Sequence, residues 1–126
     1  MNAERAIRLL IADDQASVRR SIRRLLSQIS DLVVAGEAAN GEEALNCIRT
    51  EDFDLVLLDL SMPKKSGLDV LRELKGDHRS LPVLVLSIYP ADQYKSTAME
   101  LGAAGYITKE EAPEMLVTEI RRVLGA

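Results

Sequence analysis

The chain has 126 residues, which fits one domain built around a single core. The 20 acidic and 16 basic residues give a net charge of -4, which opposes contact with a phosphate backbone, so we expect this domain itself to bind no nucleic acid. Cys47 is the only cysteine, which excludes an intrachain disulfide. No apolar run approaches the roughly 20 residues that cross a bilayer, and no signal-peptide pattern opens the chain. We therefore expect a cytoplasmic protein with no membrane partner.

Five apolar runs alternate with five stretches of helical periodicity. The runs cover residues 7–12, 32–35, 55–58, 83–86 and 106–107. The third and fourth runs are apolar at every position, which is typical of strands that are covered on both faces of a parallel sheet. The alternation predicts an α/β fold in which a doubly wound sheet of five parallel strands is flanked by five helices.

The first three helices have clear sequence signals. Residues 15–29 form an amphipathic stretch with four arginines on its polar side. Asn40 and Ser66 are capping residues for the second and third helices, and each is followed three residues later by an acid, Glu43 or Asp69. The apolar stripe of the first helix consists of Val18, Ile22, Leu25, Leu26 and Ile29.

The last two helices differ in apolar content. The fourth, over residues 92–101, offers only Ala98, Met99 and Leu101 as clear apolar contacts, which predicts loose anchoring and easy repositioning. The fifth follows Pro113 and ends near Gly125 and Ala126, where the chain stops. Its predicted buried positions are Met115, Leu116, Ile120, Val123 and Leu124.

Polar side chains follow four of the five apolar runs. Asp13 and Asp14 follow the first run, Asp59 the third, Ser87 the fourth and Lys109 the fifth. The carboxyl ends of parallel strands share one edge of the sheet, where open α/β folds bind ligands. Two like charges about 4 Å apart repel by roughly 4 kcal/mol near a protein surface, so packing alone does not explain three aspartates in one pocket. The pattern predicts a site where a cation and an anion meet.

These residue types suit phosphoryl transfer to a carboxylate. Asp59 ends the most apolar strand and can attack a phosphoryl group to form an acyl phosphate. Asp13 and Asp14 offer hard oxygen ligands for Mg²⁺. Lys109 can pair with a phosphoryl oxygen, and Ser87 can donate a hydrogen bond to another.

Nearly the whole chain resembles the receiver domain of a bacterial two-component response regulator. The matching elements, in chain order, are Asp13 with Asp14, Asp59 with Pro63 and Gly67, Ser87, and Tyr106 with Lys109. The resemblance implies a single receiver domain over residues 1–126. It also implies a flavodoxin-like (CheY-like) sheet with strand order 2-1-3-4-5.

The resemblance further implies a mechanism. Asp59 would accept a phosphoryl group from the phosphohistidine of a sensor histidine kinase, and the domain would catalyse only its own phosphorylation and dephosphorylation. Asp13, Asp14, Asp59 and the backbone carbonyl of Ser61 would surround Mg²⁺ or Mn²⁺.

A conformational switch is implied as well. Ser87 would move toward the phosphoryl group, and Tyr106 would turn inward into the vacated space. The surface formed by helix four, strand five and helix five would then change. A homodimer that forms on phosphorylation is expected, with its interface left open between helices one, four and five.

The segments 86–94 and 102–114 are most similar to the nitrate-response and nitrogen-fixation (NarL/FixJ-like) branch of the family. Members of that branch usually carry a C-terminal helix-turn-helix DNA-binding domain, and these 126 residues include none. Two readings stay open: an excised receiver that controls transcription through such a domain, or a stand-alone receiver that acts by protein contact.

Three residues near the pocket are expected to tune the acyl phosphate. Ile88 stands where many receivers have a small residue, and it would narrow the approach to Asp59. Slow entry of small phosphodonors and slow attack by water would follow. Ser61 and Tyr89 flank the acyl phosphate in the family, so they are expected to set its lifetime.

Three rival functions were weighed. A phosphatase of the haloacid-dehalogenase type normally carries a second aspartate at the position of Ser61, and without that acid the turnover of external substrates is disfavoured. A flavodoxin-like cofactor binder needs a phosphate cradle after the first strand, where this chain has two acids. The third rival, a phosphorylation-independent interaction module, is opposed by the intact set of pocket residues.

Overall fold

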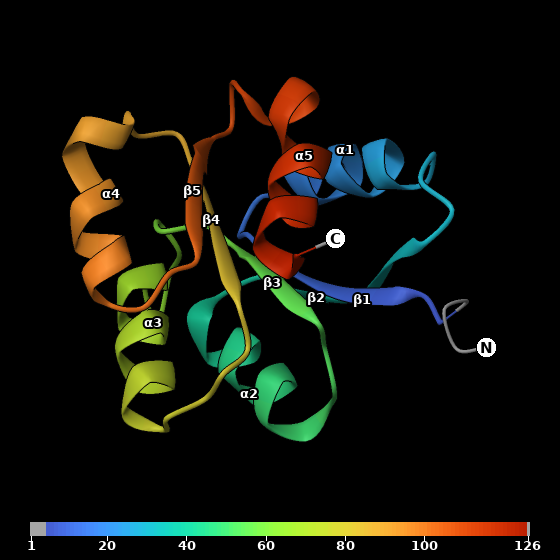
Figure 1. Cartoon of the computed structure of the whole chain (residues 1–126). Coiled ribbons are helices and arrows are strands. Elements are labelled where there is room, and N and C mark those ends of the chain that lie inside the picture. The colour runs from blue at the N-terminus through green and yellow to red at the C-terminus, as the bar shows by residue number, and fades with distance from the viewer. Residues whose placement is uncertain (1–4, 126) are drawn as a thin grey trace.

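The computed structural model describes residues 5–125 of the chain, and Figure 1 shows its five strands and five helices alternating from end to end. Ala126, named above near the predicted end of the fifth helix, lies outside the described residues. Among residues 5–125, no helix is long and apolar enough to cross a membrane. The elements are β1 (Ile7–Ala12), α1 (Ala16–Leu26), β2 (Leu32–Ala38), α2 (Gly41–Thr50), β3 (Leu55–Leu58), α3 (Gly67–Gly76), β4 (Val83–Ser87), α4 (Ala91–Glu100), β5 (Gly105–Thr108) and α5 (Ala112–Leu124).

The strands form one parallel sheet in the order β2-β1-β3-β4-β5, which confirms the predicted order. The strand ends differ from the predicted runs by one residue in β4, by three in β2 and by one at each end of β5. The central strand β3 is buried along its whole length, as its uninterrupted apolar sequence predicts. Helices therefore cover both faces of the sheet.

The helices divide between the two faces (Figure 1). Helices α1 and α5 pack on one face, where Leu9 and Ile11 of β1 join a cluster with Ile22 of α1 and Leu116 of α5. Helices α2, α3 and α4 pack on the other face against residues such as Leu10 of β1. Neighbouring residues of β1 thus point to opposite cores, as the period of a strand requires.

The predicted starts of α2 and α3 are confirmed. The Asn40 side chain accepts a hydrogen bond from the Glu43 backbone at 2.8 Å, and the Glu43 carboxylate accepts one from the Ala39 backbone at 2.8 Å. Ser66 accepts from the Asp69 backbone at 3.2 Å. Both helices are therefore capped where the sequence indicates.

Two helix predictions need correction. Helix α1 ends at Leu26 rather than at residue 29, and the Ser27 hydroxyl donates to the Arg24 carbonyl at 2.7 Å, a local bond that competes with further helix. Met115 was predicted to be buried, but it is 39% exposed. The buried stripe of α5 runs through Ala112, Leu116 and Ile120 at a spacing of four, which leaves Met115 on its flank.

The N-terminus of α3 lies directly against the end of β3. A Cβ atom added to Gly67 would lie 2.2 Å from the Asp59 carbonyl oxygen, and the Gly67 N–H donates to the Leu60 carbonyl at 2.9 Å. Glycine is therefore required where α3 meets the backbone that carries Asp59.

We predict that Gly67→Ala lowers the free energy of unfolding by about 2 kcal/mol or more, because backbone must shift to admit the methyl group. Urea denaturation measures the difference. The matched control is Gly76→Ala, where an added Cβ meets nothing within 4 Å and is expected to be neutral or to stabilise by up to about 1 kcal/mol. Equal stability of the two variants would contradict the close packing.

Candidate functional site

The sheet gathers the predicted site residues at the carboxyl ends of its strands. Asp13 follows β1, Asp59 follows β3, Ser87 ends β4 and Lys109 follows β5. The Asp59 N–H donates to the Ala12 carbonyl at 2.9 Å, and the Lys109 N–H donates to the Ser87 carbonyl at 2.8 Å. These bonds extend the parallel ladders by one step, so the backbone of both residues is held by neighbouring strands.

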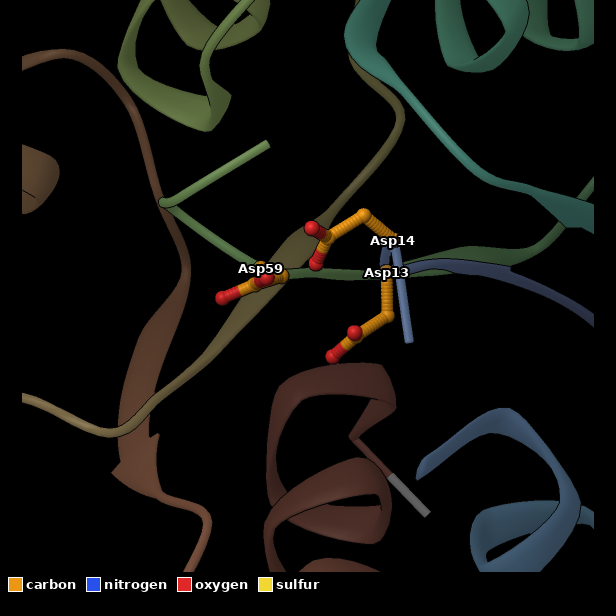
Figure 2. A group of neighbouring side chains, drawn as sticks. All are labelled: Asp13, Asp14 and Asp59. Atoms are coloured by element: carbon orange, nitrogen blue, oxygen red, sulfur yellow. The ribbon is translucent and has the colours of Figure 1, made fainter. Parts of the chain in front are cut away.

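Three carboxylates form the centre of the site (Figure 2). Asp13, Asp14 and Asp59 each offer an oxygen atom, and these atoms all lie within 4.8 Å of one another. Asp13 and Asp59 are buried, at 1% and 4% exposure, whereas Asp14 is exposed. The acidic cluster is therefore closed on the protein side and open to solvent at Asp14.

Lys109 supplies the positive charge beside this cluster. Its Nζ atom lies 2.8 Å from Asp13 Oδ2 and 3.7 Å from Asp59 Oδ1, and its side chain is only 17% exposed. The ammonium group thus bridges the two buried carboxylates and offsets the cost of burying them together.

Asp13 is also held by contacts that sequence reasoning missed. Its Oδ1 atom accepts a hydrogen bond from the Gln15 N–H at 2.9 Å, and its backbone carbonyl accepts one from the Arg19 guanidinium at 2.6 Å. An aspartate whose side chain bonds the backbone two residues on forms a turn, and here that turn ends at Gln15, the N-cap of α1. These contacts fix the orientation of the Asp13 carboxylate before any ligand binds.

The charge balance shifts the pKa of Asp59. Burial raises this pKa from 3.8 to about 6, the negative charges of Asp13 and Asp14 add to the rise, and Lys109 opposes it. The Ser61 N–H, 3.4 Å from Asp59 Oδ1, also lowers the pKa. The Asp59 carboxylate is therefore ionised at neutral pH but destabilised, so a further cation nearby would be bound favourably.

Ser87 and Tyr106 both contact Tyr89, two residues after the end of β4. The buried Ser87 Oγ accepts a hydrogen bond from the Tyr89 N–H at 3.0 Å. The Tyr106 hydroxyl donates to the Tyr89 carbonyl at 2.8 Å, and burial raises the pKa of Tyr106. The Tyr106 ring is buried in the core, and its movement in a switch stays a prediction.

The expected tuning residues lie on two loops beside Asp59. The Ser61 hydroxyl donates to the Tyr89 hydroxyl at 3.3 Å, which joins the loop after β3 to the loop after β4. The Ile88 side chain is 65% exposed. The narrowing of the pocket by Ile88 and the metal contact of the Ser61 carbonyl stay predictions.

The donor set suits a hard divalent cation. Mg²⁺ prefers oxygen ligands and usually takes one or two carboxylates together with waters, and three carboxylates converge here with one of them open to solvent. No cysteine or histidine is part of this cluster of described residues, which favours Mg²⁺ or Mn²⁺ over softer metals.

The parallel sheet and the acidic pocket with its half-buried lysine together define a receiver-type α/β domain. A family model described as the response regulator receiver domain matches residues 9–121, so the chain belongs to this family. The family places it in two-component signalling.

The curated relatives include several response regulators. UvrY of Escherichia coli K12 is 38% identical over 117 residues, which make up 93% of this chain and 54% of UvrY. The nitrate/nitrite response regulator NarL of the same organism is 34% identical over 122 residues, which make up 97% of this chain and 56% of NarL. The chain thus spans about half the length of the curated relatives it matches.

Solved structures share the fold. A LuxR-family DNA-binding response regulator from Staphylococcus aureus superposes with a TM-score of 0.87 at 29% identity, covering 94% of this chain and 98% of that one. A LuxR-family two-component response regulator from Aurantimonas gives 0.89 at 30% identity, with coverage of 95% and 86%. The response regulator domain of Thermotoga maritima CheB, at 24% identity and a TM-score of 0.88, supports the CheY-like fold alone.

The raised pKa of Asp59 predicts a pH-dependent stability in the absence of divalent cations. The protonated carboxyl is favoured in the folded state, so its stabilising contribution is present below pH 3.8 and is lost as pH rises through about 6. Between those limits, wild type should lose up to about 3 kcal/mol of unfolding free energy relative to Asp59→Asn. Urea denaturation in a chelating buffer measures both curves, and parallel curves would contradict the assigned charge balance.

Proposed function

We propose that the chain is a phosphorylation-controlled receiver in which Asp59 accepts a phosphoryl group from the phosphohistidine of a sensor histidine kinase. The observation that carries this proposal is the placement of the Asp59 carboxylate at the end of β3. It lies 3.7 Å from the Lys109 ammonium and beside the two other acids. This arrangement gives a nucleophile, a fixed positive charge and a set of hard oxygen ligands in one pocket.

In the proposed step, an Asp59 carboxylate oxygen forms a bond to phosphorus while the phosphorus–nitrogen bond of the phosphohistidine breaks. The electron pair of that bond stays on the imidazole nitrogen of the kinase. Lys109 stabilises the charge on the phosphoryl oxygens, and the Ser87 hydroxyl donates a hydrogen bond to one of them. Attack by water on the acyl phosphate then releases the group. The Ser61 position offers no general acid for the turnover of an external substrate.

The metal ligands in this proposal are Asp13, Asp14, Asp59 and the Ser61 backbone carbonyl. A bound Mg²⁺ or Mn²⁺ ion supplies Lewis-acid stabilisation of negative charge on the phosphoryl oxygens. Asp13 has one oxygen atom bonded to the Gln15 N–H and the other paired with Lys109, so its carboxylate is already oriented toward the cluster. Asp14 is exposed and completes the open side.

The proposed output is a change in the surface of α4, β5 and α5 that controls transcription, with homodimer formation on phosphorylation. The names of the relatives support this output, because they include a nitrate/nitrite response regulator and a DNA-binding response regulator. In a longer protein, a C-terminal domain would then contact DNA. A stand-alone receiver would instead use the same surface for a protein partner.

We predict that incubation with a phosphohistidine donor adds one phosphoryl group to the domain, as measured by intact-mass spectrometry. The addition should require Mg²⁺ and should be absent in Asp59→Asn, because both the nucleophile and the charge balance depend on this pocket. Acetyl phosphate serves as a second donor, and slow labelling by it alone would agree with narrowing by Ile88. No addition from the phosphohistidine donor would overturn the proposed function.

A second prediction concerns the metal. Asp14→Asn should weaken Mg²⁺ binding by about tenfold or more, measured by isothermal titration calorimetry, because one of three clustered carboxylates is lost. Its unfolding free energy without metal should be no lower than that of wild type, since Asp14 is exposed and its negative charge repels Asp59. Asp92→Asn is the matched control, as an exposed acid on α4 outside the cluster. Equal affinities in the two variants would remove Asp14 from the site.

A further inference from the structure

Tyr89 contacts four other residues: Ser61, Ser87, Tyr94 and Tyr106. Its N–H donates to Ser87 Oγ at 3.0 Å, and its carbonyl accepts from the Tyr106 hydroxyl at 2.8 Å. Its own hydroxyl accepts from Ser61 Oγ at 3.3 Å. Its ring lies 4.9 Å from the Tyr94 ring at an interplanar angle of 59°. One residue thus links the loops after β3 and β4 with β5 and α4.

Helix α4 depends on few other anchors. Ala98 is its only buried residue, and Pro90 at its N-cap provides no capping side chain. Tyr94 lies in the first half of the helix and is partly buried against the core. The contact of Tyr94 with Tyr89 is therefore a principal restraint on the N-terminal half of α4.

The contacts of Tyr89 separate into two kinds. The bonds to Ser87 and Tyr106 use the backbone, which any residue at this position would provide. The hydrogen bond with Ser61 uses the hydroxyl and the contact with Tyr94 uses the ring, and only tyrosine combines the two. The side chain of Tyr89 therefore adds a connection that the Ser87 and Tyr106 contacts do not require.

The connection begins at the phosphoacceptor. The Ser61 N–H donates to Asp59 Oδ1 at 3.4 Å, and the Ser61 hydroxyl donates to the Tyr89 hydroxyl. A path of contacts thus runs from the Asp59 carboxylate through Ser61 and Tyr89 to Tyr94 on α4.

We propose that Tyr89 is a positioning residue that couples the state of the Asp59 pocket to α4 through its hydroxyl contact with Ser61 and its ring contact with Tyr94. The phosphoryl-dependent part of this inference rests on the proposed function. The restraint on α4 in the unphosphorylated domain does not, and the two parts are tested separately.

The first arm measures amide hydrogen exchange in the metal-free, unphosphorylated domain. Tyr89→Phe and Ser61→Ala should each speed exchange in α4 by about two- to fivefold, because each removes the same exposed hydrogen bond. The double variant should be no faster than either single variant, and Ser61→Thr, which keeps a hydroxyl, should resemble wild type. Amides of α2 serve as the internal control. Wild-type exchange in α4 of both single variants, or additive effects in the double variant, would overturn the inference.

The second arm uses beryllofluoride with Mg²⁺ as a mimic of the acyl phosphate and follows backbone amide NMR shifts. In wild type, shifts should spread from the residues around Asp59 to α4. In Tyr89→Phe, the shifts around Asp59 should persist while those in α4 fall by about half or more, a pattern that uniform destabilisation would not produce. Full transmission to α4 in Tyr89→Phe would overturn the coupling. A wild type without any response would instead contradict the proposed function, and the first arm would still decide whether Tyr89 restrains α4.

Discussion

The pocket depends on the ion pair between Lys109 and two buried aspartates. Asp13 and Asp59 follow neighbouring strands of the same sheet. Both side chains are buried, so water solvates their carboxylates poorly. The Lys109 ammonium, delivered from the far edge strand β5, stands 2.8 Å from one carboxylate and 3.7 Å from the other. Even so, burial and the neighbouring acids keep the pKa of Asp59 raised at about 6, so Lys109 alone does not balance the negative charge of the pocket.

The surrounding fold divides into rigid and weakly anchored parts. The backbone on either side of Asp59 is fixed by the bond to Ala12 and by the close approach of Gly67, so Asp59 has little freedom to move. Helix α4, by contrast, has one buried residue and no capping side chain at its start. A small change of charge at a rigid site can therefore shift a neighbouring element that few contacts restrain, which is the physical basis of a receiver switch.

Much of this arrangement could be predicted from the sequence, because the positions of strands and of their polar ends are local features. The five apolar runs indicate the sheet, and Asp13, Asp59, Ser87 and Lys109 follow from the strand ends. The pairing of Lys109 with Asp13 could not be predicted, since it depends on how closely β1 and β5 loops approach in space. The prediction for Met115 was wrong because the buried stripe of α5 consists of Ala112, Leu116 and Ile120, which leaves Met115 on its flank.

The role of Tyr94 was also missed, although a signal for it exists. Tyr94, Ala98 and Leu101 recur at spacings of four and three, which marks the inner face of α4. A tyrosine in a short helix can be buried or exposed, because its ring is apolar and its hydroxyl is polar. Its contact with the Tyr89 ring is therefore seen only in the structure.

We propose that Asp59 alone carries the phosphoryl group, and finding which residue is modified tests this proposal. Borohydride reduction of the phosphorylated domain converts an aspartyl phosphate to homoserine, which peptide mass mapping then locates. We expect homoserine at position 59 and unmodified aspartate at 13 and 14, because Gln15 and Lys109 engage both carboxylate oxygens of Asp13, and Asp14 is exposed. Homoserine at Asp13 or Asp14, or a phosphoryl group that resists reduction, would contradict it.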